Sequence, residues 1–182
     1  MKGIIFNLAE EVVRSAHGED AWDAVLVGAG LEGAWTSLGS YPDEDLAKVV
    51  ASASALLGVD EQTVLRTVAE GSIPLLAQRY PHFFAPHHDT GSLILTLNDM
   101  IHPEVLKLYP GATPPSFGFE RSEDNALTMS YTSPRRLCAL AEGFIQGAAT
   151  HYGQTVAVTQ PSCMLRGDDR CLIHSEFENV PA

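Results

Sequence analysis

Residues 117–135, FGFERSEDNALTMSYTSPR, decide the fold class, because the spacing of apolar side chains changes there. Two runs, 117–119 and 127–131, place an apolar residue at every second position, and the polar segment 122–125 separates them. Side chains of a strand point alternately to opposite faces, so this pattern predicts two paired strands joined by a turn. The stretch therefore predicts a β-hairpin in a chain whose first half has a different period.

Upstream of the hairpin, apolar residues recur at the three- and four-residue spacing of amphipathic helices. The pattern predicts helices over 4–13, 46–57, 60–70, 75–80 and 93–102. Glycine often terminates a helix, so Gly71 is expected to end the third of these. The last helix is expected to end near His102, because proline follows at 103 and disfavours helical backbone before it.

Downstream of the hairpin, the pattern predicts a helix from Pro134 to about Tyr152 and strands over 155–160 and 170–177. Helices followed by an antiparallel sheet are typical of the α+β class. We expect N-terminal helices packed against a C-terminal antiparallel sheet of about four strands. The whole chain, 1–182, is expected to form one domain, helical to about residue 110 and helix-plus-sheet beyond.

The composition excludes several classes of protein. Among 182 residues, 45% are hydrophobic and 19% charged, which is typical of a globular chain. The net charge of −12 disfavours binding to nucleic acid or to an anionic membrane, since both are negatively charged. The N-terminal apolar run stops at Asn7, so no signal peptide is predicted, and no apolar run approaches the roughly 20 residues of a membrane span. Three cysteines, an odd number, favour reduced thiols in the cytoplasm.

The end of the hairpin carries the main candidate site. In an extended segment Tyr131, Ser133 and Arg135 point the same way, so two hydroxyls and a guanidinium converge. Such a trio suits a buried carboxylate, because arginine pairs with it in a bidentate manner and hydroxyls donate to its remaining lone pairs. A single histidine upstream, His102, offers a metal ligand, and the combination suits haem. The alternatives are a surface strand end with a capping serine and a purely structural histidine.

Two further clusters could hold a metal. Thiolates are good zinc ligands, and zinc takes four ligands. The three cysteines are Cys138, Cys163 and Cys171. No fourth ligand is obvious, since Gln160 would bind weakly, although His151 and His174 are near in sequence. The alternative is three buried or free thiols. The second cluster comprises His82, His87 and His88 in a proline-flanked loop, which a solvated loop also explains. No dinucleotide fingerprint, nucleophile elbow or zinc-protease motif is present.

The chain resembles the haem nitric oxide/oxygen binding (H-NOX) family, the sensor module of bacteria and of the haem end of soluble guanylate cyclase. The resemblance covers essentially the whole length. Its motifs are the opening MKGII at 1–5, the His102 helix, the loop GATPP at 111–115, the Tyr-x-Ser-x-Arg signature at 131–135 and GFIQG at 143–147. It implies a b-type haem with His102 as the proximal iron ligand and Tyr131, Ser133 and Arg135 as the propionate clamp. It also implies that Ile5 and Pro115 press on the haem.

The resemblance also has two departures. Oxygen-binding members carry a distal tyrosine where this chain has Leu140, so the pocket of leucine, alanine and Phe144 implies binding of nitric oxide and carbon monoxide rather than oxygen. Similar bacterial members hold a structural zinc through three cysteines and a histidine. The cysteines match, but Gln160 stands where that histidine is expected.

The resemblance implies a cytoplasmic sensor and not an enzyme. Nitric oxide would bind ferrous haem opposite His102, weaken the iron–histidine bond and relax the His102 helix. The signal would pass to a separate protein, which the family suggests is a histidine kinase or a diguanylate cyclase or phosphodiesterase. The alternative is a non-haem regulatory domain that binds a small molecule and is stabilised by zinc. A haem peroxidase is disfavoured, because no distal acid–base pair is predicted.

Overall fold

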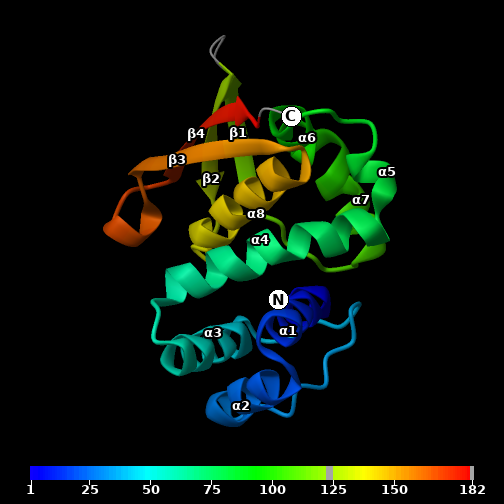
Figure 1. Cartoon of the computed structure of the whole chain (residues 1–182), viewed down its shortest axis with the longest axis vertical. Helices are drawn as coiled ribbons and strands as arrows, with labels where there is room; N and C mark the ends of the chain where they lie inside the picture. Colours follow the sequence, from blue (N-terminus) through cyan, green and yellow to red (C-terminus); the bar gives the residue numbers. More distant parts are fainter. Residues whose placement is uncertain (122–124, 181–182) are drawn as a thin grey trace.

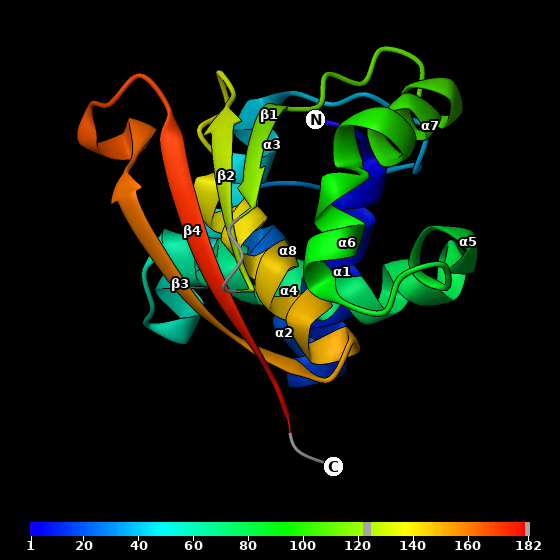
Figure 2. The same ribbon diagram turned by 90° about the horizontal axis from the view of Figure 1, so that it is seen from above.

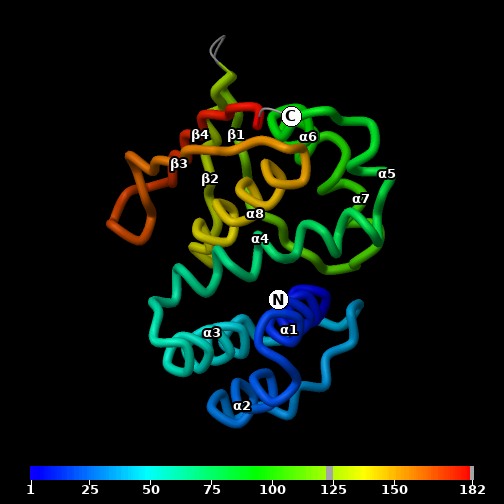
Figure 3. The backbone as a smooth tube through the Cα atoms, viewed as in Figure 1, coloured from blue at the N-terminus to red at the C-terminus, as the bar shows by residue number. Residues whose placement is uncertain are grey.

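The computed structural model describes residues 1–121 and 125–180, and it divides into a helical part and a part that holds a sheet. Figure 1 shows three helices below the long helix α4 and the sheet above it. The lower helices are α1 (Gly3–His17), α2 (Glu19–Ala29) and α3 (Asp43–Leu57), and α4 spans Glu61–Arg79. Helix α8 (Cys138–His151) lies between α4 and the sheet (Figure 1). Figure 3 follows the backbone from α1 below α4 to the last strands above it.

The sheet confirms the predicted antiparallel arrangement. Its strands are β1 (Ser116–Arg121), β2 (Ala126–Thr132), β3 (Gln154–Ser162) and β4 (Cys171–Asn179), in the order β1-β2-β4-β3. All neighbours are antiparallel, with Phe117 opposite Tyr131 and Tyr131 opposite Cys171. Alternate β2 and β4 side chains are buried in a cluster with residues of α8. Of the predicted turn at 122–125, residues 122–124 lie outside the described part of the chain.

The prediction that Gly71 ends a helix is wrong, because α4 continues through Gly71 and Pro74 to Arg79. Tertiary packing explains both residues. A methyl group on Gly71 would lie 2.9 Å from the Val12 side chain of α1, so glycine allows the two helices to approach closely. Pro74 has no N–H to give to the Glu70 carbonyl, and that carbonyl faces Gly147 of α8 instead, 2.6 Å from where a methyl group would be.

The segment around His102 also differs from expectation. The predicted single helix is three pieces, namely α6 (Thr90–Leu95), a π-helical turn (Leu97–Ile101) and α7 (His102–Leu108). His102 begins α7 rather than ending a helix, and proline is tolerated in a first turn because its missing N–H has no partner there. In the π-turn the N–H of His102 bonds the carbonyl of Leu97, one residue further back than in an α-helix. Seen from above, α6 and α7 lie across α8 from the sheet (Figure 2).

Each part of the fold has a large apolar cluster, and a third, smaller cluster lies around Phe83 and Phe84. One lies among α1 to α4 and includes the fully buried Phe6 and Trp22. The other lies between α8 and the inner face of the sheet, around Ile173. At the far end of α7, the buried Tyr109 shares a hydrogen bond of 2.8 Å with the hydroxyl of Tyr80 next to α4. Within the described residues, no helix has the length and apolar character needed to cross a bilayer.

Candidate functional site

The Tyr-x-Ser-x-Arg segment joins the end of β2 to the start of α8. Tyr131 is buried near the end of β2, and its hydroxyl accepts a 3.0 Å hydrogen bond from the Leu137 N–H. Ser133 is buried just after the strand, and its hydroxyl accepts a 3.3 Å hydrogen bond from the Arg135 N–H. Pro134 and Arg135 form a turn, so the expectation of a fully extended segment is wrong. Proline at this position favours a turn, and the chain must reverse here to enter α8.

Arg135 already holds a carboxylate. Its Nε donates to Asp43 Oδ2 at 2.8 Å, and its Nη1 donates to the carbonyl and hydroxyl of Thr113, both at 2.8 Å. Asp43 also accepts a 2.6 Å hydrogen bond from the N-terminal ammonium of Met1. Burial opposes ionisation of Asp43, but the Met1 ammonium and Arg135 outweigh it and lower the pKa of the carboxyl. The guanidinium is therefore shaped and placed for carboxylate binding.

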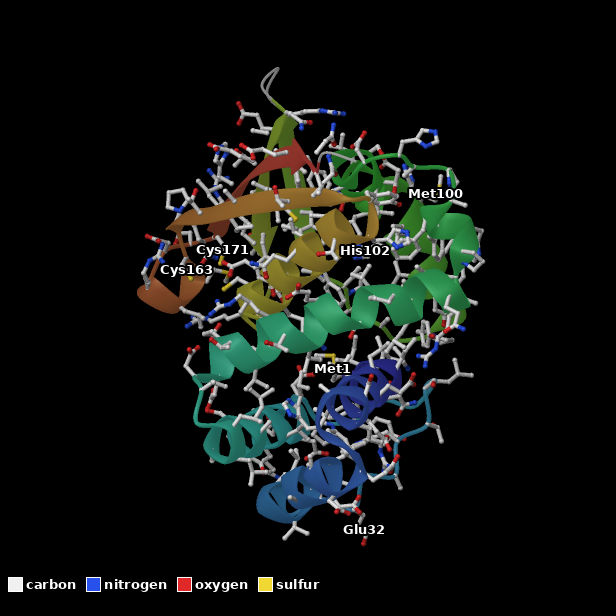
Figure 4. The ribbon with its side chains drawn as sticks, viewed as in Figure 1. Met1, Glu32, Met100, His102, Cys163 and Cys171 are labelled. Atoms are coloured by element: carbon white, nitrogen blue, oxygen red, sulfur yellow. The ribbon has the colours of Figure 1, made fainter. Side chains whose placement is uncertain are left out.

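His102 is the second part of the site (Figure 4). Its ring is half-buried at the start of α7 and stacks on Phe117 of β1, with centroids 5.4 Å apart and planes at 22°. Burial lowers the pKa of the imidazole, which favours the neutral form that ligates a metal. Among the described residues, none makes a hydrogen bond to this ring. Its nitrogens are therefore free of the partners that usually satisfy a structural histidine.

These donors fit a haem. A neutral imidazole without a protein partner suits iron, and a guanidinium with two buried hydroxyl-bearing neighbours suits a propionate. Pro115, half-buried in the loop before β1, lies two residues from Phe117 and so beside the same strand end. The residues present are thus consistent with the cofactor that the sequence suggested.

Only two of the three residues expected around the bound gas lie together. Ile5 of α1 and Leu140 of α8 line one small apolar cavity of about 20 Å³. All residues that line this cavity are apolar. Phe144 lies one turn further along α8 and packs instead in a cluster with Phe84 and Ile101. The structure therefore brings together Ile5 and Leu140 and places Phe144 nearer the π-turn.

The three cysteines, far apart in sequence, form a buried cluster. Their sulfur atoms all lie within 4.8 Å of one another, and those of Cys138 and Cys163 are 3.7 Å apart (Figure 4 labels Cys163 and Cys171). Burial raises the pKa of the Cys171 thiol to about 12, so it is protonated without a metal. No histidine or carboxylate of the described residues joins the three sulfurs.

The histidines considered as fourth ligand or as a separate metal site lie elsewhere. His174 bonds Thr128 and Glu176 on the sheet, and His151 packs its ring against Phe84. In the loop, His82 packs on Phe83, and the histidines at 82 and 88 are exposed. Within the described part of the chain, the thiols are the one group of three such side chains arranged around a common point. A solvated loop therefore explains His82 and His88 better than a metal site does, whereas the Nε2 atom of His87 is buried and has no hydrogen-bond partner among the described residues.

Sequence reasoning missed Asp43 and Thr113 as partners of Arg135. Asp43 sits in the first turn of α3, where an acid is expected for the helix dipole alone. Nothing in its neighbourhood in the sequence signals a partner 92 residues away.

A sequence model of the Haem-NO-binding family matches residues 2–160. The chain belongs to this family. An H-NOX protein from Shewanella oneidensis, a triple mutant in the Fe(II) state, is 31% identical with a TM-score of 0.92, over 100% of this chain and 98% of that one. The Fe(II)NO form of an S. oneidensis H-NOX protein is 32% identical with a TM-score of 0.90, over 98% and 100% of the two chains. The Fe(II)CO form of the Shewanella domain is 32% identical with a TM-score of 0.88, over 99% and 100%. Comparison with curated proteins gave no match.

H-NOX membership establishes the broad function. The family binds haem and senses gases, and the structural relatives include nitric oxide and carbon monoxide complexes. The α+β architecture with its antiparallel four-stranded sheet is shared with these proteins. His102 and the 131–135 segment lie in the part of the chain that the family model covers, whereas Cys163 and Cys171 lie beyond it.

Proposed function

We propose that this H-NOX domain is a haem-based nitric oxide sensor with His102 as the proximal iron ligand. The carrying observation is the ring of His102, which is half-buried, favoured in its neutral form and without a hydrogen-bond partner among the described residues. Arg135, with Tyr131 and Ser133 beside it, would hold the propionates, while Ile5 and Pro115 would contact the porphyrin. When bound, the haem supplies a ferrous iron that takes up a diatomic gas.

The side chains around the bound gas would determine which gases the haem binds. No polar atom is exposed in the small cavity that Ile5 and Leu140 line, so neither residue would bring a hydrogen-bond donor to a bound gas. Bound oxygen carries partial negative charge and benefits from a donor, whereas nitric oxide binds ferrous iron strongly without one. We therefore infer nitric oxide and carbon monoxide as ligands and exclude stable oxygen binding.

The same residues supply a route for the signal. His102 begins α7 directly after the π-turn, so loss of its bond to iron would release that end of the helix. We propose that this domain is not a catalyst and passes the change to a separate signalling protein, such as a histidine kinase or a diguanylate cyclase or phosphodiesterase. Its three free thiols favour the reducing cytoplasm.

Absorption spectroscopy tests the proposal. Protein from cells supplied with haem precursors should contain about one b-type haem per chain, bound without covalent attachment because no Cys-x-x-Cys-His is present. The reduced protein should bind nitric oxide and carbon monoxide and form no stable oxygen complex in air. His102→Gly should lose the iron–histidine bond, and added imidazole should restore it, while His88→Gly in the exposed loop should behave as the parent. A haem-free protein that takes up no haemin would favour the non-haem alternative.

We also propose that the thiol cluster binds one zinc ion. The sulfur spacing supports it: three buried thiols that share one point are the donor set of a thiophilic cation. Zinc analysis of protein purified without chelator should find about one ion per chain, lost in Cys163→Ser. Retention of full zinc by Cys163→Ser would place the ion elsewhere.

A further inference from the structure

Phe117 of β1 lies between the two halves of the candidate haem site. Its ring stacks on that of His102, with centroids 5.4 Å apart and planes at 22°, and lies 5.8 Å from the ring of Tyr131 with planes at 50°. Phe117 and Tyr131 are directly opposite each other in the antiparallel pair of β1 and β2. One side chain therefore packs against both the expected iron ligand and a member of the expected propionate clamp.

Three contacts hold Phe117 itself in place. The pairing of β1 with β2 runs along the whole strand and fixes the backbone at this residue. The carbonyl of Phe117 accepts a 3.0 Å hydrogen bond from Nδ2 of Asn98, which belongs to the π-turn before His102. The ring also stacks on Phe119, two residues along the strand, with centroids 6.0 Å apart and planes at 29°. Phe117 thus offers the imidazole a surface that does not depend on the imidazole for its own position.

The imidazole of His102 depends on this surface for its orientation. A histidine that ligates a metal usually donates its second ring N–H to a carboxylate, a carbonyl or a water molecule, and that bond fixes the ring. No residue of 1–121 or 125–180 makes such a hydrogen bond to His102. The stack on Phe117 is therefore the contact that selects the rotation of the ring about its bond to Cβ.

We propose that Phe117 is a positioning residue of the gas sensor, whose stack orients the His102 imidazole and couples that ring to Tyr131. A ligand that is already held in its binding orientation loses less conformational freedom when it binds. The stack should therefore favour the bond between His102 and iron by about two- to tenfold, the usual contribution of one aromatic pair. The inference rests on the proposed ligation of iron by His102 and gives a role to a residue that the strand pattern leaves as part of the sheet.

Free imidazole separates the stack from the position of the helix. In haem-loaded His102→Gly protein, added imidazole has no link to the backbone of α7, so its affinity reports side-chain contacts. Adding Phe117→Leu to this variant should weaken imidazole binding by about two- to tenfold in an absorbance titration of the ferrous haem. Phe117→Met removes the ring but keeps most of its volume, and should show the same loss. Phe117→Tyr keeps the ring and should show none.

Phe119→Leu is the matched control. It removes the neighbouring half-buried ring of the same strand, and Phe119 makes no aromatic contact with His102 among the described residues. With His102 intact, resonance Raman of the ferrous protein should show a broader iron–histidine stretching band in Phe117→Leu than in the parent, because the imidazole samples more orientations. Phe119→Leu should keep the band of the parent. Both leucine variants should lose similar stability on thermal unfolding, so stability alone would not separate their spectra.

Two results would overturn the inference while leaving the sensor proposal intact. Equal imidazole affinity with and without Phe117→Leu would show that the stack does not orient the ring. An equal loss in Phe119→Leu would mean that both residues act through the sheet as a whole. Failure of the sensor proposal looks different, because the ferrous, haem-loaded parent would then show no iron–histidine band, and the role of Phe117 would fall with it.

Discussion

Arg135 is the residue on which haem retention should depend most. Its guanidinium donates hydrogen bonds to Asp43 and Thr113, and a haem propionate would bind to the same guanidinium. We expect Arg135→Ala to release haem roughly ten- to a hundredfold faster, because a hydrogen bond to a charged group contributes about 1.5–3 kcal/mol. Transfer of haem to a scavenging apoprotein measures the rate. Arg136→Ala, the exposed neighbour, is the control, and equal rates for the two variants would refute the clamp.

Leu140 is the residue that should decide between gases. A donor at this position would stabilise bound oxygen by about 1–3 kcal/mol, which is roughly ten- to a hundredfold in affinity. Leu140→Tyr should therefore gain an oxygen complex in air, seen in the absorption spectrum of the reduced protein, and lose little affinity for carbon monoxide. Leu140→Phe adds the ring without the hydroxyl and should gain nothing. A persistent oxygen complex of the parent would contradict the apolar pocket.

For single residues, the sequence identified the candidate site residues better than it identified the residues that they contact. His102 and the Arg135 trio are visible because their polar side chains are costly to bury without a partner, and the three cysteines because thiolates are good zinc ligands. The contacts of Arg135 with Asp43 and Thr113 were not visible, because they depend on how distant segments pack. The turn at Pro134 and Arg135 was likewise not predicted, because strand alternation alone does not reveal a reversal of the chain.

Between elements, the closest approach is that of α8 to α4. A methyl group on Gly143 would lie 2.2 Å from the carbonyl oxygen of Arg66, and backbone cannot move aside as a flexible side chain can. We expect Gly143→Ala to lower the free energy of unfolding by about 1–3 kcal/mol, the usual cost of overpacking. Urea unfolding followed by circular dichroism measures it. Thr150→Ala on the exposed face of α8 is the matched control and should change stability by less than about 0.5 kcal/mol.

The sequence predicted which elements exist and failed where packing overrides local signals. The strands and α8 were predicted because their apolar period is clear and their ends carry turn residues. Gly71 was misread as a helix end, because its real role is to let α1 approach α4 closely. The π-turn has no local signature, and so one helix was predicted where three segments occur.

Across the whole molecule, Asp43 joins the helical part to the part that bears the sheet. Its carboxylate meets the Met1 ammonium and Arg135, which keep its pKa in the folded protein below the ordinary value, although burial opposes them. The unfolded chain therefore binds this proton more readily, so the stabilisation is present above about pH 4 and is lost as the pH falls.

Asp43→Asn should consequently destabilise the protein at pH 7 by under about 1 kcal/mol, since the side chain is 46% exposed and solvent screens the pairs. The difference from the parent should stay nearly constant from pH 7 to about 4 and shrink as the pH falls further, toward the lowered pKa of the folded protein. Chemical unfolding at several pH values measures it. Asp45→Asn, whose carboxylate pairs only with Lys48 at 3.5 Å among the ion pairs of the described residues, is the control. A difference that stays constant with pH would mean that Asp43 acts through packing.

The π-turn before His102 has a consequence for chain length. In a π-turn each N–H bonds the carbonyl five residues earlier, so the turn contains one residue more than an α-helical turn. Ile101 and His102 make such bonds here. Removing one residue from Leu97–Met100 would leave an α-turn and keep His102 on its present face. Removing one residue from α6, which contains no extra residue, would rotate the imidazole by about 100° around the helix axis. The π-turn therefore lets the chain lose one residue there without turning His102 away from its present face.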